Sequence, residues 1–461
     1  MVPLAKVANS ACGKDVNSNE KFNATIVTQA VGLVAQRRIE KMIRRSKLQN
    51  SGFSDANGGV AAAMEYSIDD FHIEKTLGEG SFGQVSQVRL KQHHAKLPST
   101  SNRSAKADDV CTSATPYYAL KCLNKKTLAA TKSPTVSKDK FRKMVAAYID
   151  LATEAHMLGQ LDHENIVKLY GVHASIEQYF FIMDVLHETL RARLHRWRIS
   201  NGRCHFTKEA IMSRIEIAAL GVVKAMEYLH SRNIIFQDLK PENIGFDADG
   251  KVKLFDFGLA REVHMVDHDK TVGSLPYIAP ECCFVLSNNN SSNSARSNRG
   301  ATFTSRSSSL VSLDASISSQ ISLQSQSQKY STSGLHSDIY SFGILLWEIC
   351  TLRNAFDQFK CETLHCKQLS DRIKWRPSTT KSDIEIIPSQ TIETLITNCW
   401  HANPKYRPTF NYIKQVLESK TIKKKTNKRR SSTTLLRRCS LGLIRHDSVN
   451  GSTVCAATSM P

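Results

Sequence analysis

Apolar and polar positions alternate in the segment that begins at Phe71, on both sides of a glycine-rich turn. The same alternation returns between Tyr117 and Leu123, and a period of two predicts β-strands in both places. From Asp139 to Leu161 the spacing changes to that of a helix with one apolar face. That face consists of Phe141, Met144, Tyr148, Leu151, Ala155 and Leu158. A further helix is predicted in the strongly apolar segment from His336 to Thr351.

Two polar inserts interrupt this pattern. Residues 91–116 are rich in Ser, Ala, Lys and His, and a surface loop tolerates such a length because closure entropy rises only logarithmically. Residues 287–334 contain 18 serines among 48 positions, which leaves too little apolar surface to offset chain entropy. We therefore expect the second insert to be disordered.

The segment before the strands differs from the rest of the chain. Residues 1–66 are mostly polar and predicted to be disordered, except for an amphipathic basic helix between Ala24 and Leu48. This helix is expected to pack on the folded core as a strut. Targeting to a membrane surface or an organelle is the weaker alternative, because Asp15 and Glu20 interrupt the acid-poor pattern of a transit peptide.

Positive charge is concentrated at the other end. The formal net charge is +20, and nine Lys or Arg residues lie between Lys420 and Arg438 without an acidic residue. Such a run is typical of a solvated tail, so residues 419–461 are predicted to be a basic disordered tail. The tail is a candidate contact for acidic lipid or for an import receptor, and no specific nucleic acid is implied.

Composition places the chain among globular proteins. Its 461 residues are 41% apolar, which is enough for a large core. We expect no transmembrane segment, because no run of about 18 apolar residues occurs, and no compact apolar stretch marks a secretory signal. Twelve cysteines follow no regular framework and indicate reduced thiols. A cytoplasmic location is expected, with nuclear entry if the tail is an import signal.

Five short motifs stand in a fixed order and carry the candidate chemistry. They are Gly78-Glu79-Gly80-Ser81-Phe82-Gly83-Gln84-Val85, Ala119-Leu120-Lys121, Asp238-Leu239-Lys240-Pro241-Glu242-Asn243, Asp256-Phe257-Gly258 and Ala279-Pro280-Glu281. A glycine-rich turn lets backbone amides approach phosphates, and here a strand follows the turn, whereas a helix follows it in dinucleotide sites. The ordered set resembles the eukaryotic protein kinase signature.

The resemblance implies an α+β fold with two lobes within residues 67–418. The N-lobe, residues 67–185, would contain an antiparallel sheet and one helix, and the C-lobe, residues 186–418, would be mainly helical. The implied activity is transfer of the γ-phosphate of ATP, with Mg²⁺, to hydroxyls of protein substrates in intracellular signalling.

The resemblance also assigns roles to individual residues. The implied catalytic residues are Asp238, Lys240, Lys121 and Glu154. Asp238 would accept the substrate hydroxyl proton, Lys240 would place a cation beside the phosphoryl group, and Lys121 would hold the phosphates while paired with Glu154. The implied metal ligands are Asn243 and Asp256. The implied nucleotide-binding residues are Gly78, Glu79, Gly80, Ser81, Phe82, Gly83, Val85, Ala119, Lys121, Met183, Asp184, Leu186, Asn243, Gly245 and Asp256.

The acceptor class follows from the motif around Asp238. In the family, Asp-x-Lys-x-x-Asn accompanies transfer to Ser or Thr, and the hydroxyl of Ser274 agrees with that class. Leu345-Leu346-Trp347-Glu348-Ile349 and Cys399-Trp400 resemble the tyrosine-kinase-like group instead. Dual specificity therefore stays open, and a pseudokinase scaffold and a kinase for small molecules are further alternatives.

Two positions depart from the family pattern. Gln237 replaces the usual arginine that pairs with an activation-segment phosphate, so we expect activity that does not depend on such a phosphate at Thr271. Gly245 replaces an apolar residue that packs beneath the adenine. The glycine is expected to leave a gap and weaken nucleotide binding unless Ile244, Phe246 or Met183 fills it.

Two structural pairings are expected as well. Glu281 should pair with Arg407 and hold the end of the activation segment, and Asp338 should bond backbone N–H groups of the catalytic loop. Phe236 should join an apolar stack with Leu158, Leu169 and Phe257.

Overall fold

A computed structural model describes part of the chain. The described residues are 24–43, 66–80, 83–91, 116–123, 138–174, 179–199, 207–267, 272–282, 334–357, 376–377 and 386–419. The chain divides into two compact units, Met1–Lys414 and Gln415–Pro461. All elements discussed below lie in the first unit; in the second, residues 415–419 are helical. Both proposed inserts and the basic tail lie largely outside the described residues.

A five-stranded antiparallel sheet forms the N-lobe, in the order β1-β2-β3-β5-β4. Its strands are β1 (Phe71–Glu79), β2 (Gly83–Leu90), β3 (Tyr117–Leu123), β4 (Leu169–Ala174) and β5 (Tyr179–Met183). Alternate residues of a strand face opposite sides, so Tyr118 and Leu120 share one apolar face with Phe180 and Ile182 of β5. Lys121, the residue after Leu120, faces the other side. The predicted antiparallel sheet is confirmed.

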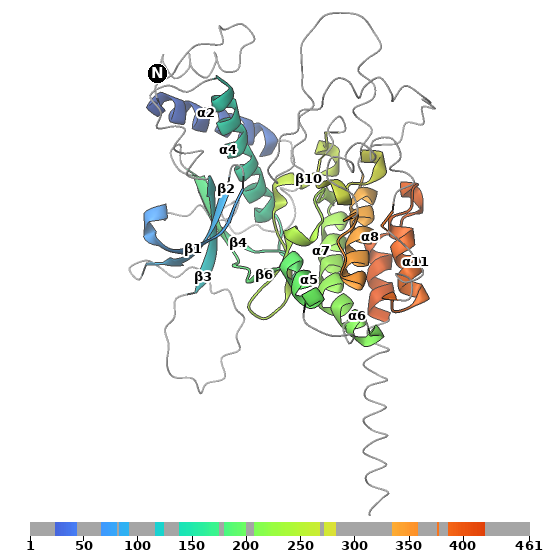
Figure 1. The fold of residues 1–461 in the computed structure, drawn as a ribbon. Helices are drawn as coiled ribbons and strands as arrows, with labels where there is room; N and C mark the ends of the chain where they lie inside the picture. Colours follow the sequence, from blue (N-terminus) through green and yellow to red (C-terminus); the bar gives the residue numbers. More distant parts are fainter. Residues whose placement is uncertain are drawn as a thin grey trace, which may run out of the picture. The chain divides into compact units, whose positions relative to one another are not determined.

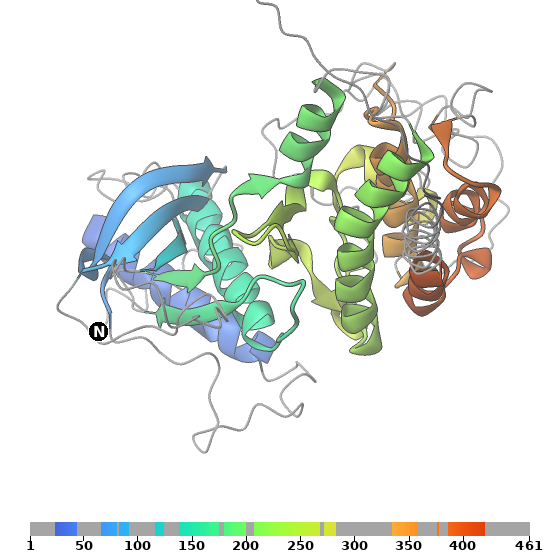
Figure 2. The ribbon, with the colours of Figure 1, turned by 90° about the horizontal axis from the view of Figure 1, so that it is seen from below.

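Two helices belong to this lobe. Helix α4 (Lys138–Gly159) packs against β3, β4 and β5, and helix α2 (Ala24–Ile43) packs against α4 (Figure 1). The view from below shows α2 and α4 as neighbours beside the sheet (Figure 2). The expectation that the N-terminal helix packs on the core is confirmed; the helix is described from Ala24 to Ile43, and residues 44–48 of the expected helix lie outside the described residues.

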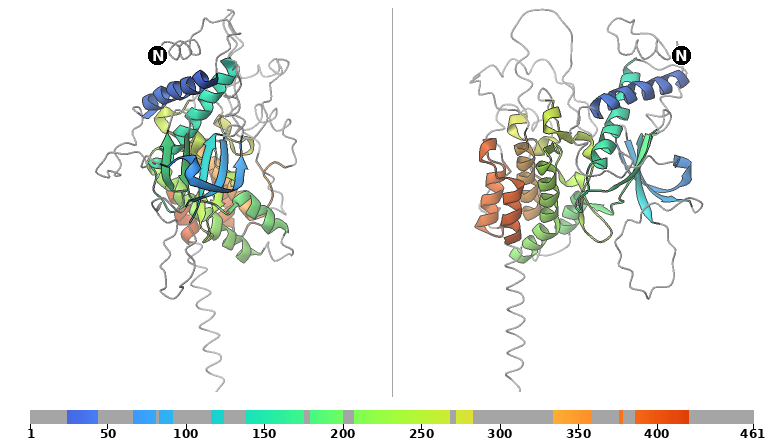
Figure 3. Two further views of the ribbon diagram at one scale, coloured as in Figure 1. Left: turned by 90° about the vertical axis from the view of Figure 1, so that its left-hand side faces the viewer. Right: turned by 180° about the vertical axis from the view of Figure 1, so that it is seen from behind.

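The C-lobe is mainly helical. Its longer helices are α5 (Leu190–Ile199), α6 (Lys208–Arg214), α7 (Leu220–Ser231), α8 (His336–Thr351) and α11 (Gln390–Cys399), with a π-helical turn η4 (Ile215–Ala219) between α6 and α7. Helix α8 is buried from Ser337 to Thr351, because α11, α6 and η4 contact it on several sides (Figure 3). A helix that is apolar all round must be buried in this way.

Short strands and 3₁₀ turns of the C-lobe carry the motif residues. Two small sheets consist of β6 (Glu188–Thr189), β8 (Ile244–Phe246) and β9 (Val252–Leu254), and of β7 (Ile234–Ile235) and β10 (Arg261–Glu262). The 3₁₀ turns of the C-lobe are η5 (Pro241–Asn243), η6 (Phe257–Leu259), η7 (Val263–Met265), η8 (Leu275–Tyr277) and η12 (Pro404–Tyr406), whereas η2 (Ile68–Asp70) precedes β1 in the N-lobe. Within the described ranges, no helix combines the length and the apolar character that a membrane crossing requires.

Candidate active site

A buried ion pair joins the sheet to α4. The Nζ atom of Lys121 lies 2.6 Å from both carboxylate oxygens of Glu154 and 3.0 Å from Oδ1 of Asp256. The Glu154 side chain is only 1% exposed. Because a buried charge left without its partner is strongly destabilising, the lysine and both carboxylates fix one another's positions. The expected Lys121–Glu154 pairing is confirmed.

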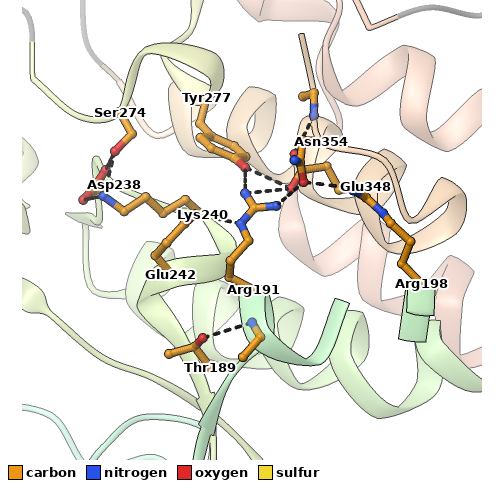
Figure 4. Close-up of polar contacts among 12 residues, drawn as sticks. Thr189, Arg191, Arg198, Asp238, Lys240, Glu242, Ser274, Tyr277, Glu348 and Asn354 are labelled. Carbon is orange, nitrogen blue, oxygen red and sulfur yellow. Dashed lines mark hydrogen bonds and ion pairs between the residues drawn. The ribbon is translucent and has the colours of Figure 1, made fainter. Parts of the chain in front are cut away.

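The loop after β7 brings a second polar group together around Asp238. Lys240 Nζ lies 2.8 Å from Asp238 Oδ2, and Asn243 donates through Nδ2 to the same oxygen at 2.8 Å and to the Asp238 carbonyl at 2.9 Å. The hydroxyl of Ser274 donates to Asp238 Oδ1 at 2.9 Å and accepts from Lys240 Nζ at 2.7 Å (Figure 4). A carboxylate, an ammonium and a hydroxyl therefore meet within hydrogen-bond distance.

Backbone pairing brings the two polar groups to one edge. The N–H of Phe255 donates to the carbonyl of Asn243 at 3.0 Å, directly before Asp256. Asp256 itself adopts a left-handed conformation with φ 63°. A strained conformation of this kind persists only where surrounding structure enforces it, and it directs the carboxylate toward Lys121. Asn243 and Asp256, far apart in sequence, thus project from adjacent backbone.

Asp338 anchors the catalytic loop from below. Its carboxylate is fully buried and accepts hydrogen bonds from the N–H groups of Phe236 and Gln237, both at 2.9 Å. It also lies 3.0 Å from Nε2 of His230. These bonds support Gln237 in its left-handed conformation, with φ 66°. The expected role of Asp338 as an anchor is confirmed.

Two aromatic rings meet under this loop. The rings of Phe236 and Phe257 are both buried, and their centroids lie 5.1 Å apart in an edge-to-face arrangement. This is the favoured geometry for an aromatic pair. The contact between Phe236 and Phe257 in the expected apolar stack is therefore confirmed. Leu158, a further member of that stack, is buried.

The connecting segment after β5 is tethered by Asp184. Its carboxylate accepts hydrogen bonds from the hydroxyl of Tyr170 at 2.7 Å and from the N–H of Lys168 at 3.0 Å, and it lies 3.1 Å from Nζ of Lys253. Burial and the Asp184 charge raise the pKa of Tyr170, so its hydroxyl remains a donor. Residues of both lobes therefore hold the beginning of this segment in place.

Gly245 corrects one expectation. A Cβ at this position would lie 2.6 Å from Cδ1 of Leu186, so the space is filled and not a gap. The three nearest side-chain atoms all belong to Leu186, which is not among the expected fillers. The reason is tertiary: Thr189 of β6 pairs with Gly245 of β8, and this pairing brings the connecting segment alongside.

The glycine-rich turn joins β1 to β2. The N–H of Gly80 donates to the carbonyl of Gly83 at 2.8 Å, and Glu79 pairs with Gln84. Strand β2 pairs with β3, which places Val85 opposite Lys121, and β3 pairs with β5, which places Ala119 opposite Met183. Of the expected nucleotide-binding residues, Gly78 lies on β1, whereas Ser81 and Phe82 lie outside the described residues.

The activation segment is closed by a buried ion pair. Arg407 binds both carboxylate oxygens of Glu281, at 2.5 and 2.8 Å, and its side chain is 0% exposed. The expected pairing is confirmed. Thr271 lies outside the described residues.

A polar cluster that sequence reasoning missed surrounds Arg191 of α5. Its guanidinium contacts Glu242 at 2.7 Å, the hydroxyl of Tyr277 at 2.6 Å and Glu348 at 3.3 Å (Figure 4). Tyr277 also donates to Glu348 at 2.9 Å. Burial raises the pKa values of Tyr277 and Glu348. The available signal was a glutamate inside the apolar segment 336–351, which needs a partner.

Comparison with protein families agrees with this geometry. Residues 112–296 match the model of the protein kinase domain, and residues 323–417 match that of the protein tyrosine and serine/threonine kinase family. The chain belongs to the eukaryotic protein kinase superfamily. The first matched range ends and the second begins inside the serine-rich insert, so that residues 297–322 are unmatched.

The relatives of this kinase chain include both acceptor classes. It is 32% identical to cAMP-dependent protein kinase type 3 of Saccharomyces cerevisiae over 47% of the chain and 43% of that protein. It is 28% identical to human receptor-interacting serine/threonine-protein kinase 1 over 58% of the chain and 33% of that protein. Fibroblast growth factor receptor 1 of Pleurodeles waltl is 26% identical over 82% of the chain and 38% of that protein. The chain thus spans less than half the length of each.

Proposed function

We propose that the chain is a protein serine/threonine kinase that transfers the γ-phosphoryl group of ATP to hydroxyls of protein substrates. The contacts of the Ser274 hydroxyl support this most directly, because it bonds Asp238 and Lys240 together. A substrate hydroxyl needs the same two neighbours: a carboxylate that accepts its proton and a cation beside the transferred group.

Four side chains divide the work in this proposal. Asp238 orients the acceptor hydroxyl and takes its proton late, when bonding to the leaving group has already weakened. Lys240 stabilises the negative charge that is spread over the moving phosphoryl oxygens. Lys121, held by Glu154, positions the phosphates of the nucleotide.

The donor set fits magnesium. When bound, Mg²⁺ would neutralise charge on the phosphate oxygens. The Nδ2 group of Asn243 is committed to Asp238, which directs the amide Oδ1 away from that carboxylate and offers it as a hard ligand. Asp256 provides carboxylate oxygens from the adjacent backbone. Asn243 and Asp256 would therefore hold the ion.

The nucleotide base would lie against the connecting segment. Backbone groups of Asp184 and Leu186 would bind the purine edge, with Val85, Ala119 and Met183 as apolar neighbours and Gly245 opposite Leu186. The glycine-rich turn, residues 78–83, would cover the phosphates with backbone amides. Asp184 is suited to this position because its side chain is fixed by Tyr170 and Lys253.

Replacement of Asp238 by Asn tests the proposal. We expect kcat for a Ser/Thr peptide to fall by about 10²–10⁴-fold, because the carboxylate can no longer accept the proton. Asp249→Asn, the same change at an exposed carboxylate of the same lobe, should leave kcat unchanged. Magnesium-dependent ATP binding without transfer by the wild-type chain would instead identify a pseudokinase scaffold.

A positional peptide library with Ser, Thr or Tyr acceptors decides the acceptor class. We expect phosphate on Ser and Thr, since Lys240 and Ser274 accompany that class. Equal transfer to Tyr would show dual specificity. Cytoplasmic proteins with exposed hydroxyls are the proposed substrates, and residues 420–438 are a proposed contact for an import receptor or acidic lipid.

A further inference from the structure

Helix α4 is enclosed to an unusual degree. Every residue from Leu151 to Leu158 is buried, although an amphipathic helix on a sheet normally leaves one face in water. The sheet covers the face that carries Glu154, because Lys121 of β3 reaches that carboxylate. Other elements cover the remaining faces of α4, and the 3₁₀ turn η6 (Phe257–Leu259) is one of them.

Helix α2 also contacts α4. Among the described helices, α2 and α4 pack most extensively against each other, and the views in Figure 1 and Figure 3 agree on their proximity. Ala35 of α2 is 0% exposed and Val34 is 7% exposed. Small buried residues let two helices approach closely. The apolar face of α2 is therefore occupied within the chain.

The opposite face of α2 is polar. The exposed residues of its described part are Gln36, Arg37, Arg38, Glu40 and Lys41. Exposed and buried residues are thus immediate neighbours at positions 35 and 36. A carboxylate introduced at position 35 would be forced into a buried contact, whereas a carboxylate at position 36 would be solvated.

We propose that Val34 and Ala35 are positioning residues that act through α4 to keep Glu154 beside Lys121. This inference rests on the proposed function, in which the Lys121–Glu154 pair orients the nucleotide phosphates. The sheet and η6 contact α4, and α2 adds a further contact that limits a shift of α4 across the sheet. Such a restriction matters because displacements of about 1 Å in a supporting element can cost about 10²-fold in rate.

A matched pair of variants of the full chain tests the proposal. Ala35→Asp should lower kcat by about 10²-fold, and Gln36→Asp should leave it unchanged. Both proteins are checked by circular dichroism and thermal melting, and kcat is expressed per mole of folded protein. Ala35→Ser, which keeps a small side chain, should restore near-normal kcat.

A double-mutant cycle separates positioning from general damage. If α2 acts through Glu154, Ala35→Asp should have almost no further effect on kcat in a Glu154→Gln background. Independent effects that multiply to the full 10²-fold would overturn the proposal.

Hydrogen exchange supplies a readout that needs no activity. The amides of residues 151–158 should exchange faster in Ala35→Asp than in Gln36→Asp. Unchanged exchange would overturn the proposal even if the chain is an active kinase. If the wild-type chain lacks transferase activity and Ala35→Asp still exchanges faster than Gln36→Asp, the result would support the packing role and reject only the proposed function. Were Ala35→Asp unfolded, Val34→Ala would replace it, with a smaller change expected in the same direction.

Discussion

At the scale of single residues, Leu186 and Gly245 form a complementary pair. The sequence marked Gly245 as a departure from the family, yet the glycine is not a defect, because Leu186 fills the space that a side chain would take. Residue 245 and residue 186 are therefore constrained together. A larger residue at one position requires a smaller residue at the other.

Gly245→Leu tests this pair. Its Cβ would lie 2.6 Å from Cδ1 and 3.2 Å from Cβ of Leu186, so the Leu186 side chain must shift away from position 245. We expect the KM for ATP to rise about tenfold, which is typical of overpacking. The double variant Leu186→Ala with Gly245→Leu should recover most of the loss. A double variant as poor as Gly245→Leu alone would mean that Leu186 is not the source of the clash.

At the scale of elements, the activation segment docks on the catalytic loop through its backbone. Gly273 has φ 109°, and a Cβ there would lie 2.5 Å from the carbonyl oxygen of Gln237. Ser274 continues the contact through its bonds to Asp238 and Lys240. These contacts hold residues 272–282 against the loop by packing and hydrogen bonding. They agree with the expectation that a phosphate clamp is not needed.

Gly273→Ala should impair this docking. An alanine costs strain at positive φ and also collides with Gln237, so we expect kcat to fall by about tenfold or more.

Thr271→Ala should retain most of its activity, because Gln237 cannot form a charge-assisted pair with a phosphate. Both variants are assayed after phosphatase treatment. Loss of nearly all activity in Thr271→Ala would refute the phosphate-independent hypothesis.

At the scale of the whole first unit, buried ion pairs connect segments far apart in sequence. Glu281 and Arg407 are 126 positions apart, and the cluster around Arg191 joins α5, η5, η8 and α8. Such pairs contribute little relative to well-packed apolar residues, but loss of one partner leaves the other charged and buried. The end of the activation segment therefore depends on the late helices of the C-lobe.

Arg407→Met tests this dependence. With Glu281 left unpaired, the free energy of unfolding should fall by about 3–5 kcal/mol. Lys405→Met changes an exposed cation two residues away and should alter it by less than about 0.5 kcal/mol. Urea denaturation of the two variants measures the difference. A loss for Arg407→Met no greater than that for Lys405→Met would contradict the argument.

The amino-acid sequence by itself determined the local parts. Periods of two and of 3.6 predicted the strands near Phe71 and Tyr117 and the helix that became α4, because side-chain spacing follows directly from backbone geometry, and the strongly apolar segment 336–351 predicted α8. The ordered motifs likewise predicted Lys121 beside Glu154 and Asp338 beneath the catalytic loop. These pairings follow from resemblance to a fold in which the same spacings recur.

Only the tertiary structure decided which segments meet when no motif links them. Leu186 against Gly245, Arg191 among Tyr277 and Glu348, and α2 against α4 all depend on side-chain shape at contacts between distant segments. Neither hydrophobic period nor local propensity encodes that shape. A period indicates that a helix face will be buried, but the partner that buries it is chosen by the packing of the folded chain.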